Sequence, residues 1–196
     1  MTRVTYYFTP VSGFAWVGHR AFLDLAAKAG AEVIFRPFDI LALFAAQGTV
    51  PPPKQGDLRL SYRREDMARW AARRGVALNP VPAHWPAPSA PSCKVILAAG
   101  ALGHGMGDVA EALMRGIWAE EKDIADRADL SAILDGAGYP ADEILARAET
   151  AEIETTLREN GAAAQADGVF GSPTYVVGGT RFFGQDRLDF VAEALA

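Results

Sequence analysis

The chain has 196 residues, of which 50% are hydrophobic and 22% are charged, a length and balance that suit one globular domain or a domain with a large insertion. The net charge of −5 and an isoelectric point near 5.2 argue against a nucleic-acid-binding protein. The first residues lack the apolar core of a signal peptide, and no apolar run is long enough to span a membrane. We therefore expect a cytoplasmic protein without a membrane partner.

The first forty residues predict a β-α-β unit. An aromatic and β-branched run at 3–8 is typical of a strand, and the amphipathic pattern at 14–29 indicates a helix that ends at Gly30. Residues 32–38 predict a second strand. Because one helix connects the two strands, we expect them to be parallel.

The middle of the chain is predicted to be helical. Residues 47–57 are rich in Gly and Pro and indicate a loop, and a helix is expected at about 57–75. A proline-rich connector follows at 79–91. Further helices are expected near 92–102, 107–120, 129–136, 141–147 and 150–166.

The last thirty residues return to strand character. The segments 174–177 and 180–183 flank Gly178-Gly179, which predicts a β-hairpin with a Gly-Gly turn. Residues 185–195 predict a final amphipathic helix. The order is therefore a βαβ half, an all-helical stretch, and a helix followed by a hairpin and a helix.

The turn Thr9-Pro10-Val11-Ser12 lies between the first strand and the first helix. Free backbone N–H groups and the helix dipole favour a negatively charged atom at such a helix start. The hydroxyl groups of Thr9 and Ser12 either contact that atom or only cap and shape the turn.

Cys93 is the only cysteine, so the chain cannot form an internal disulfide. We interpret it as a buried core residue rather than a nucleophile. The three histidines are scattered, and no Cys/His cluster has the spacing of a zinc site, so no metal is expected.

The element order and several segments resemble the DsbA-like thioredoxin superfamily. Within it, the chain is similar to the 2-hydroxychromene-2-carboxylate isomerases and, less closely, to the kappa-class glutathione transferases. The segments that carry the resemblance are Tyr7-Phe8-Thr9-Pro10-Val11-Ser12, Arg36-Pro37-Phe38-Asp39-Ile40, Arg69-Trp70-Ala71, Trp118-Ala119-Glu120, Gly168-Val169-Phe170-Gly171-Ser172-Pro173-Thr174 and Phe183-Gly184-Gln185-Asp186-Arg187-Leu188.

The resemblance implies an α/β protein with a thioredoxin-like fold and an all-helical domain inserted after the βαβ half. Residues 1–45 and 165–196 would form the thioredoxin-like domain, and residues 46–164 the insertion. The turn Thr9–Ser12 stands where redox members have Cys-Pro-x-Cys, so a dithiol oxidoreductase is excluded.

The resemblance also implies a glutathione-dependent isomerase that interconverts 2-hydroxychromene-2-carboxylate and trans-o-hydroxybenzylidenepyruvate, or a related aromatic carboxylate, in aromatic catabolism. Glutathione would act as a cofactor, since its thiolate adds to the substrate and is later released. Two alternatives remain open: a kappa-like glutathione transferase, which would release the conjugate, and a non-catalytic thioredoxin-like module that binds a peptide. A homodimer is the family expectation.

Site residues follow from the same resemblance. Thr9 stands where the family usually has a serine that hydrogen-bonds the glutathione sulfur, and Ser12 is the second candidate donor. Ser172 and Pro173 resemble a cis-proline turn whose backbone pairs with the cysteinyl part of glutathione, unless this Pro is an ordinary trans residue.

The ends of glutathione and the second substrate are assigned in the same way. Gln185 and Asp186 would hold the γ-glutamyl end, although Asp186 is also suited to cap the last helix. Thr49 and Lys54 would contact the glycyl end, with a solvated surface position as the alternative for Lys54. The candidates for the substrate are Trp85, as an aromatic wall, and Lys94, as a partner for its carboxylate.

Overall fold

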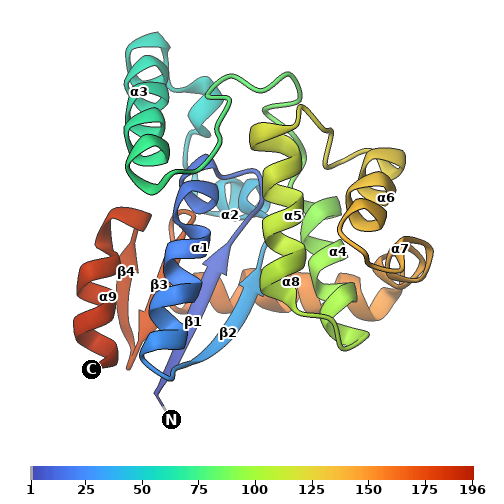
Figure 1. The fold of residues 1–196 in the computed structure, drawn as a ribbon. Helices are drawn as coiled ribbons and strands as arrows, with labels where there is room; N and C mark the ends of the chain where they lie inside the picture. Colours follow the sequence, from blue (N-terminus) through green and yellow to red (C-terminus); the bar gives the residue numbers. More distant parts are fainter. Residues whose placement is uncertain (1) are drawn as a thin grey trace.

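The computed structural model describes residues 2–196 (Figure 1). Its elements, in chain order, are β1 (Arg3–Phe8), α1 (Gly13–Lys28), β2 (Glu32–Pro37), α2 (Ile40–Gln47), the short 3-10 helix η1 (Pro52–Lys54), α3 (Asp57–Arg74), α4 (Ala90–Ala101), α5 (Met106–Ala119), α6 (Arg127–Gly136), α7 (Ala141–Ala148), α8 (Ala151–Ala166), β3 (Thr174–Val177), β4 (Thr180–Phe183), the 3-10 helix η2 (Gln185–Arg187) and α9 (Leu188–Leu195). The predicted strands and helices are confirmed, with small differences at their ends. None of the helices in residues 2–196 is long and apolar enough to cross a membrane.

The four strands form one mixed sheet in the order β2-β1-β3-β4. β1 and β2 are parallel, which confirms the crossover predicted from the sequence. β3 pairs with β1 and with β4 in the antiparallel sense, so the C-terminal hairpin is also confirmed.

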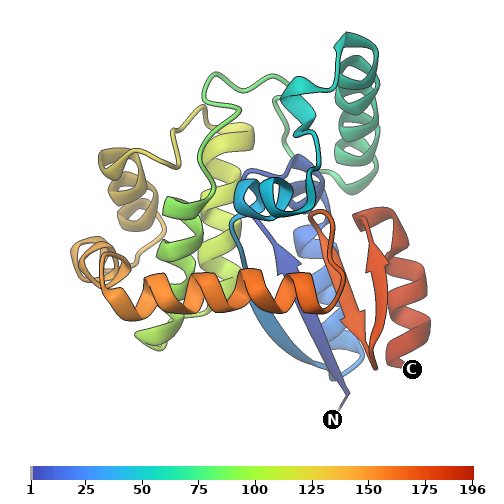
Figure 2. The ribbon, with the colours of Figure 1, turned by 180° about the vertical axis from the view of Figure 1, so that it is seen from behind.

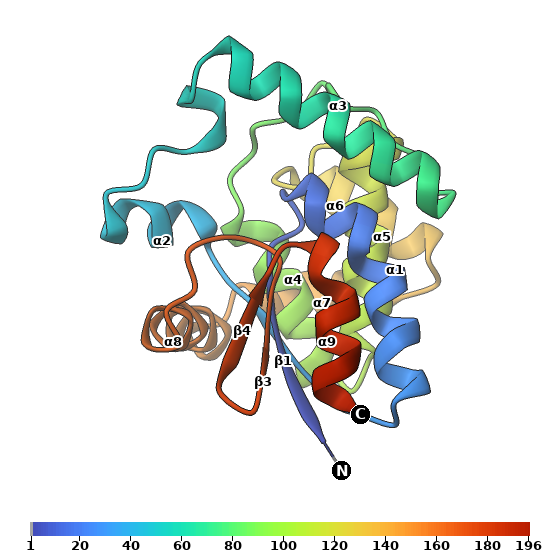
Figure 3. The same cartoon turned by 90° about the vertical axis from the view of Figure 1, so that its left-hand side faces the viewer.

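Helices cover both faces of this sheet. α1 and α9 lie on one face and α8 crosses the other, as Figures 2 and 3 show. Alternate residues of β1 follow this division: the Tyr6 ring lies 4.6 Å from that of Phe22 in α1, and the Tyr7 hydroxyl donates to Asp167, just after α8, over 2.7 Å. Because successive side chains of a strand point to opposite faces, an unbroken aromatic run can fill both layers.

The remaining helices gather at the edge of β2 and above the carboxyl end of β1. α5 packs against α1, and α4 packs against β2, α7 and α8. α3 lies across the end of the molecule where α1 begins (Figures 1 and 3). The start of α1 is therefore enclosed by helical segments far from it in sequence.

Helix α2 was not predicted. Its sequence is almost uniformly apolar and lacks the periodicity that distinguishes a helix from a buried strand. Its boundary signals are nevertheless present, since Asp39 accepts hydrogen bonds from the N–H groups of Leu41 (3.0 Å) and Ala42 (3.4 Å), and Gly48 has a positive φ of 65°. The helix continues across the proposed insertion boundary at residues 45–46.

Candidate functional site

The turn between β1 and α1 is closed by its own polar groups. The N–H of Ser12 donates to the carbonyl oxygen of Thr9 over 3.1 Å. The Ser12 hydroxyl caps α1, because its Oγ accepts a hydrogen bond from the N–H of Ala15 over 3.3 Å. The positive end of the α1 dipole thus lies at this turn.

Two tryptophans from the helical region hold the same turn. Trp118 in α5 is fully buried and its Nε1 donates to the carbonyl oxygen of Pro10 over 3.0 Å. Trp85, in the proline-rich connector, donates from Nε1 to the carbonyl oxygen of Val11 over 3.1 Å. Trp118 is therefore a core residue that also holds the turn through its hydrogen bond.

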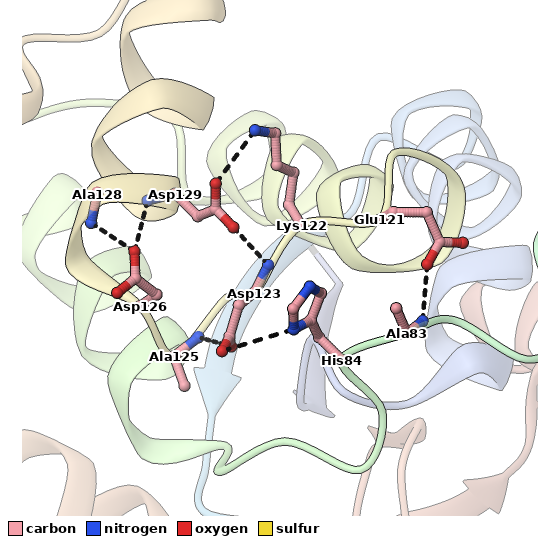
Figure 4. A network of polar contacts seen from close by, with 9 residues as sticks. All are labelled: Ala83, His84, Glu121, Lys122, Asp123, Ala125, Asp126, Ala128 and Asp129. Carbon is pink, nitrogen blue, oxygen red and sulfur yellow. Dashed lines mark hydrogen bonds and ion pairs between the residues drawn. The ribbon is translucent and has the colours of Figure 1, made fainter.

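A polar network fixes the connector that carries Trp85 (Figure 4). The N–H of Ala83 donates to Glu121 Oε2 over 2.7 Å, and His84 Nδ1 lies 3.8 Å from Asp123 Oδ2. The hydrogen bonds that Glu121 accepts, first from the Ala83 N–H and then from the Asn79 side chain, hold the pKa of its carboxyl below the usual range. The connector is thereby tied to the loop between α5 and α6, which sets the position of Trp85.

A cavity of about 300 Å³ opens beside the turn. Residues of the turn, of the proline-rich connector and of helices α1, α2 and α3 line this cavity. The loop between α2 and α3, the segment before β3 and the end of β4 complete the lining. Five residues proposed from the sequence line it: Thr9, Ser12, Thr49, Trp85 and Ser172. Its other lining side chains are largely apolar, and none of those described is acidic.

A second cavity of about 200 Å³ adjoins the first. Ser172, with Phe14 and Phe183, lines both cavities. The second cavity contains two further residues proposed from the sequence, Gln185 and Asp186, together with Asp66 and Arg187, which were not proposed. An extended ligand can therefore contact both cavities while passing Ser172.

The Ser172–Pro173 peptide bond is cis, as the resemblance implied. Pro173 itself is buried, and its carbonyl oxygen accepts a hydrogen bond from Gly184 N–H over 2.9 Å. The N–H of Thr9 donates to Ser172 Oγ over 3.1 Å, which places Ser172 directly beside the turn. Within residues 2–196 the Ser172 N–H has no hydrogen-bond acceptor, so it is available to an added strand.

The two candidate hydroxyl groups differ in what they already contact. Ser12 Oγ donates its only proton to the carbonyl oxygen of Ser172 over 2.8 Å. Thr9 Oγ1 lies 3.8 Å from the Sγ of Cys93, a weak partner. Thr9 is therefore the donor that a stronger acceptor, such as a thiolate, can recruit.

Cys93 is fully buried in α4. Its thiol donates to the carbonyl oxygen of Phe38 over 3.3 Å. Burial raises the pKa of Cys93 to about 12, so the thiol stays protonated at neutral pH. The interpretation of Cys93 as a core residue is confirmed.

Among residues 2–196, no group of His, Cys, Asp and Glu side chains is arranged to hold a metal ion.

Two lysines proposed from the sequence lie outside both cavities. Lys54 is exposed on η1, and its neighbours rather than Lys54 itself line the larger cavity. Lys94 forms an ion pair with Glu154, with 3.3 Å between Nζ and Oε2, and borders a separate hollow between α4 and α7. Neither lysine is brought to the turn.

Arg63 and Phe14 also line the larger cavity, and neither was among the site residues proposed from the sequence. The guanidinium carbon of Arg63 lies 4.7 Å from the ring centroid of Phe14 and 5.9 Å from that of Trp85, and all three side chains line the larger cavity. No local pattern marks Arg63, because α3 also carries five other arginines.

Known proteins share the fold of this chain over nearly its whole length. A family model described as a DSBA-like thioredoxin domain matches residues 3–196. A 2-hydroxychromene-2-carboxylate isomerase from Sphingobium xenophagum is 29% identical over 201 residues, covering 100% of this chain and 99% of the relative.

Solved structures show the same fold. A 2-hydroxychromene-2-carboxylate isomerase superposes with a TM-score of 0.86 at 22% identity, covering 98% of this chain and 94% of the other. The cytosolic disulfide reductase DsbM from Pseudomonas aeruginosa, solved with GSH, gives a TM-score of 0.66 at 18% identity, covering 98% of this chain and 93% of the other. The predicted thioredoxin-like fold is confirmed.

Proposed function

This chain belongs to the DSBA-like thioredoxin domain family, and on that premise we propose that it is a glutathione-dependent isomerase of the 2-hydroxychromene-2-carboxylate type. One observation carries the proposal: the turn at the start of α1 keeps the geometry that favours a thiolate, yet it has hydroxyl groups in place of both thiols. The sulfur must then come from a ligand. The full-length similarity to a curated isomerase supports the choice of reaction.

The linings of the two adjoining cavities support glutathione as the ligand. A γ-glutamyl end carries both an ammonium and a carboxylate, and the smaller cavity offers the carboxylates of Asp66 and Asp186 beside the guanidinium of Arg187. Arg187 Nη1 lies 2.9 Å from Asp186 Oδ2, so the two charges are already arranged as a pair. The Ser172 backbone would pair with the cysteinyl unit, and Thr49 would contact the glycyl end in the larger cavity.

When bound, glutathione would supply a thiolate able to add reversibly to a conjugated carbon of the substrate, which would let the former double bond rotate. The chain's own residues prepare this step. The Thr9 hydroxyl would donate a hydrogen bond to the glutathione sulfur, and the amino end of α1 would favour the negative charge of the thiolate. The aromatic walls formed by Phe14 and Trp85 exclude water and orient a flat substrate.

The proposal includes a cytoplasmic location and small-molecule partners. Glutathione is kept reduced in the cytosol, and the similar DsbM structure is that of a cytosolic protein with GSH. A homodimer is part of the same proposal, and sedimentation of the purified chain tests it.

The decisive experiment follows conversion of 2-hydroxychromene-2-carboxylate by absorbance, with glutathione, without it, and with S-methylglutathione. We expect turnover only with free glutathione, because the methylated tripeptide can bind but has no ionisable thiol. Turnover that needs no thiol would refute the proposal. Accumulation of a stable thioether would instead indicate a transferase.

A further inference from the structure

The larger cavity contains one charged side chain among those described, that of Arg63 in α3. Arg63 forms no hydrogen bond and no ion pair with any residue in the described range 2–196. Its Nε is buried and has no partner. A cation held in an apolar cavity without a counter-charge is costly, and a bound anion removes most of that cost.

Two other arginines of the same helix have polar partners. Arg69 Nη2 lies 2.8 Å from Glu65 Oε2, and Arg74 Nη2 donates to the carbonyl oxygen of Gln185 over 2.9 Å. The guanidinium of Arg63 instead lies over the faces of two aromatic rings, those of Phe14 and Trp85. These contacts hold the guanidinium plane in place and leave its hydrogen-bond donors free for a ligand.

Burial lowers the pKa of the Arg63 guanidinium to about 10. The side chain therefore remains a cation at neutral pH. No acidic side chain lines the cavity in the described part of the chain, so nothing there competes for the guanidinium.

We propose that Arg63 binds the carboxylate of the aromatic substrate and holds the substrate ring against Phe14 and Trp85. The identity of the substrate rests on the proposed function, whereas the carboxylate site rests on the cavity itself. The glycyl end of glutathione is the other source of a carboxylate. The largely apolar and aromatic lining of this cavity favours the substrate, since a flat aromatic acid buries its ring against such walls and the short glycyl end of the peptide does not.

The test compares two probes of equal shape, 2-naphthoate and 2-naphthamide, which differ in charge. Binding is measured by quenching of tryptophan fluorescence and by calorimetry, with and without glutathione. The wild-type protein is expected to bind the carboxylate about 10- to 100-fold more tightly than the amide, the range for a hydrogen bond between charged groups. In Arg63→Gln this ratio should fall to about one.

Arg64→Gln is the matched control, because Arg64 is the next residue of α3, is exposed, and lines neither cavity. It removes the same charge and should keep the wild-type ratio. Arg63→Lys keeps a cation but loses the planar fork, so an intermediate ratio is expected. If Arg63→Gln does not fold, the ratio of naphthoate to naphthamide affinity in Arg63→Lys tests the proposal instead.

Unchanged discrimination in the Arg63 variants would overturn the proposal. So would a tenfold loss of glutathione affinity with the naphthoate ratio intact, because Arg63 would then serve the glycyl carboxylate. The probes need no turnover. If the wild-type chain fails to isomerise the chromene but discriminates between the probes through Arg63, the proposed function fails and the carboxylate site stands.

Discussion

The hydroxyl of Thr9 is the group on which activation of a bound thiol depends most directly. Thr9→Val removes this hydroxyl and nearly preserves the shape of the side chain. Thr9 is only 1% exposed, and its hydroxyl has one weak contact in the described structure, the 3.8 Å approach to Cys93 Sγ. Its backbone N–H bond to Ser172 Oγ does not involve the hydroxyl and should persist. The variant should therefore fold, with a loss of about 1 kcal/mol or less in the free energy of unfolding.

The expected effect on the thiol is larger. A hydrogen bond to a charged group contributes about 1.5–3 kcal/mol. At about 1.4 kcal/mol per unit, its loss should raise the pKa of bound glutathione by about one to two units. At neutral pH, kcat/KM should fall by about 10- to 100-fold, and activity should recover as the pH is raised by the same interval. Thr9→Ser keeps the hydroxyl and should stay close to wild type.

The assay is a pH titration of the ultraviolet absorbance of the thiolate in the protein–glutathione complex, with calorimetry to measure the affinity. Ser12→Ala provides the contrast. The Ser12 proton is already donated to the Ser172 carbonyl oxygen, so this variant should cost about 1 kcal/mol of stability through the lost helix cap. It should change the thiol pKa little. A larger pKa rise in Ser12→Ala than in Thr9→Val would refute the reasoning.

Three further predictions concern groups around the site. Burial lowers the pKa of His19 to about 4 from 6.5. The stability that depends on neutral His19 is therefore complete above pH 6.5 and is lost as the pH falls toward 4, by about 3 kcal/mol in all. Urea unfolding between these pH values measures this loss, and a free energy of unfolding that does not change with pH would contradict the prediction. In Gly13→Ala, the new Cβ would lie 2.4 Å from Met67 Sδ and 3.1 Å from the Trp118 ring, so thermal unfolding should show a loss of about 1–3 kcal/mol. The Cys93 thiol should react with an aromatic disulfide reagent only after unfolding, and Cys93→Ala should retain isomerase activity; rapid labelling of the native protein would show that the thiol is accessible.

Local signals in the sequence predicted most of the fold. The β-branched and aromatic strands, the Ser12 cap and the Gly178-Gly179 turn act over a few residues, so their structural meaning can be recognised without the rest of the chain. Helix α2 escaped prediction because a uniformly apolar segment has no periodicity, although Asp39 and Gly48 mark its ends.

The sequence predicted those site residues that are close together along the chain, and the resemblance predicted those that come from a distant segment. Thr9, Ser12 and Ser172 belong to this group, and hydrogen bonds join them where the turn after β1 lies beside the segment before β3. Lys94 shows the limit of this approach. Its choice of partner depends on how α4 packs against α8, and there Glu154 is the nearest carboxylate.

By itself, the sequence determined the strands, the helix cap and the missing thiols, because each is a property of a few neighbouring residues. Only the tertiary structure decided which cation faces the cavity. Arg63 and Arg64 are adjacent and chemically identical, yet Arg63 lies over two aromatic rings in the cavity and Arg64 is exposed. A helix turns by about 100° per residue, so the placement of α3 over the start of α1 separates two residues that the sequence cannot tell apart.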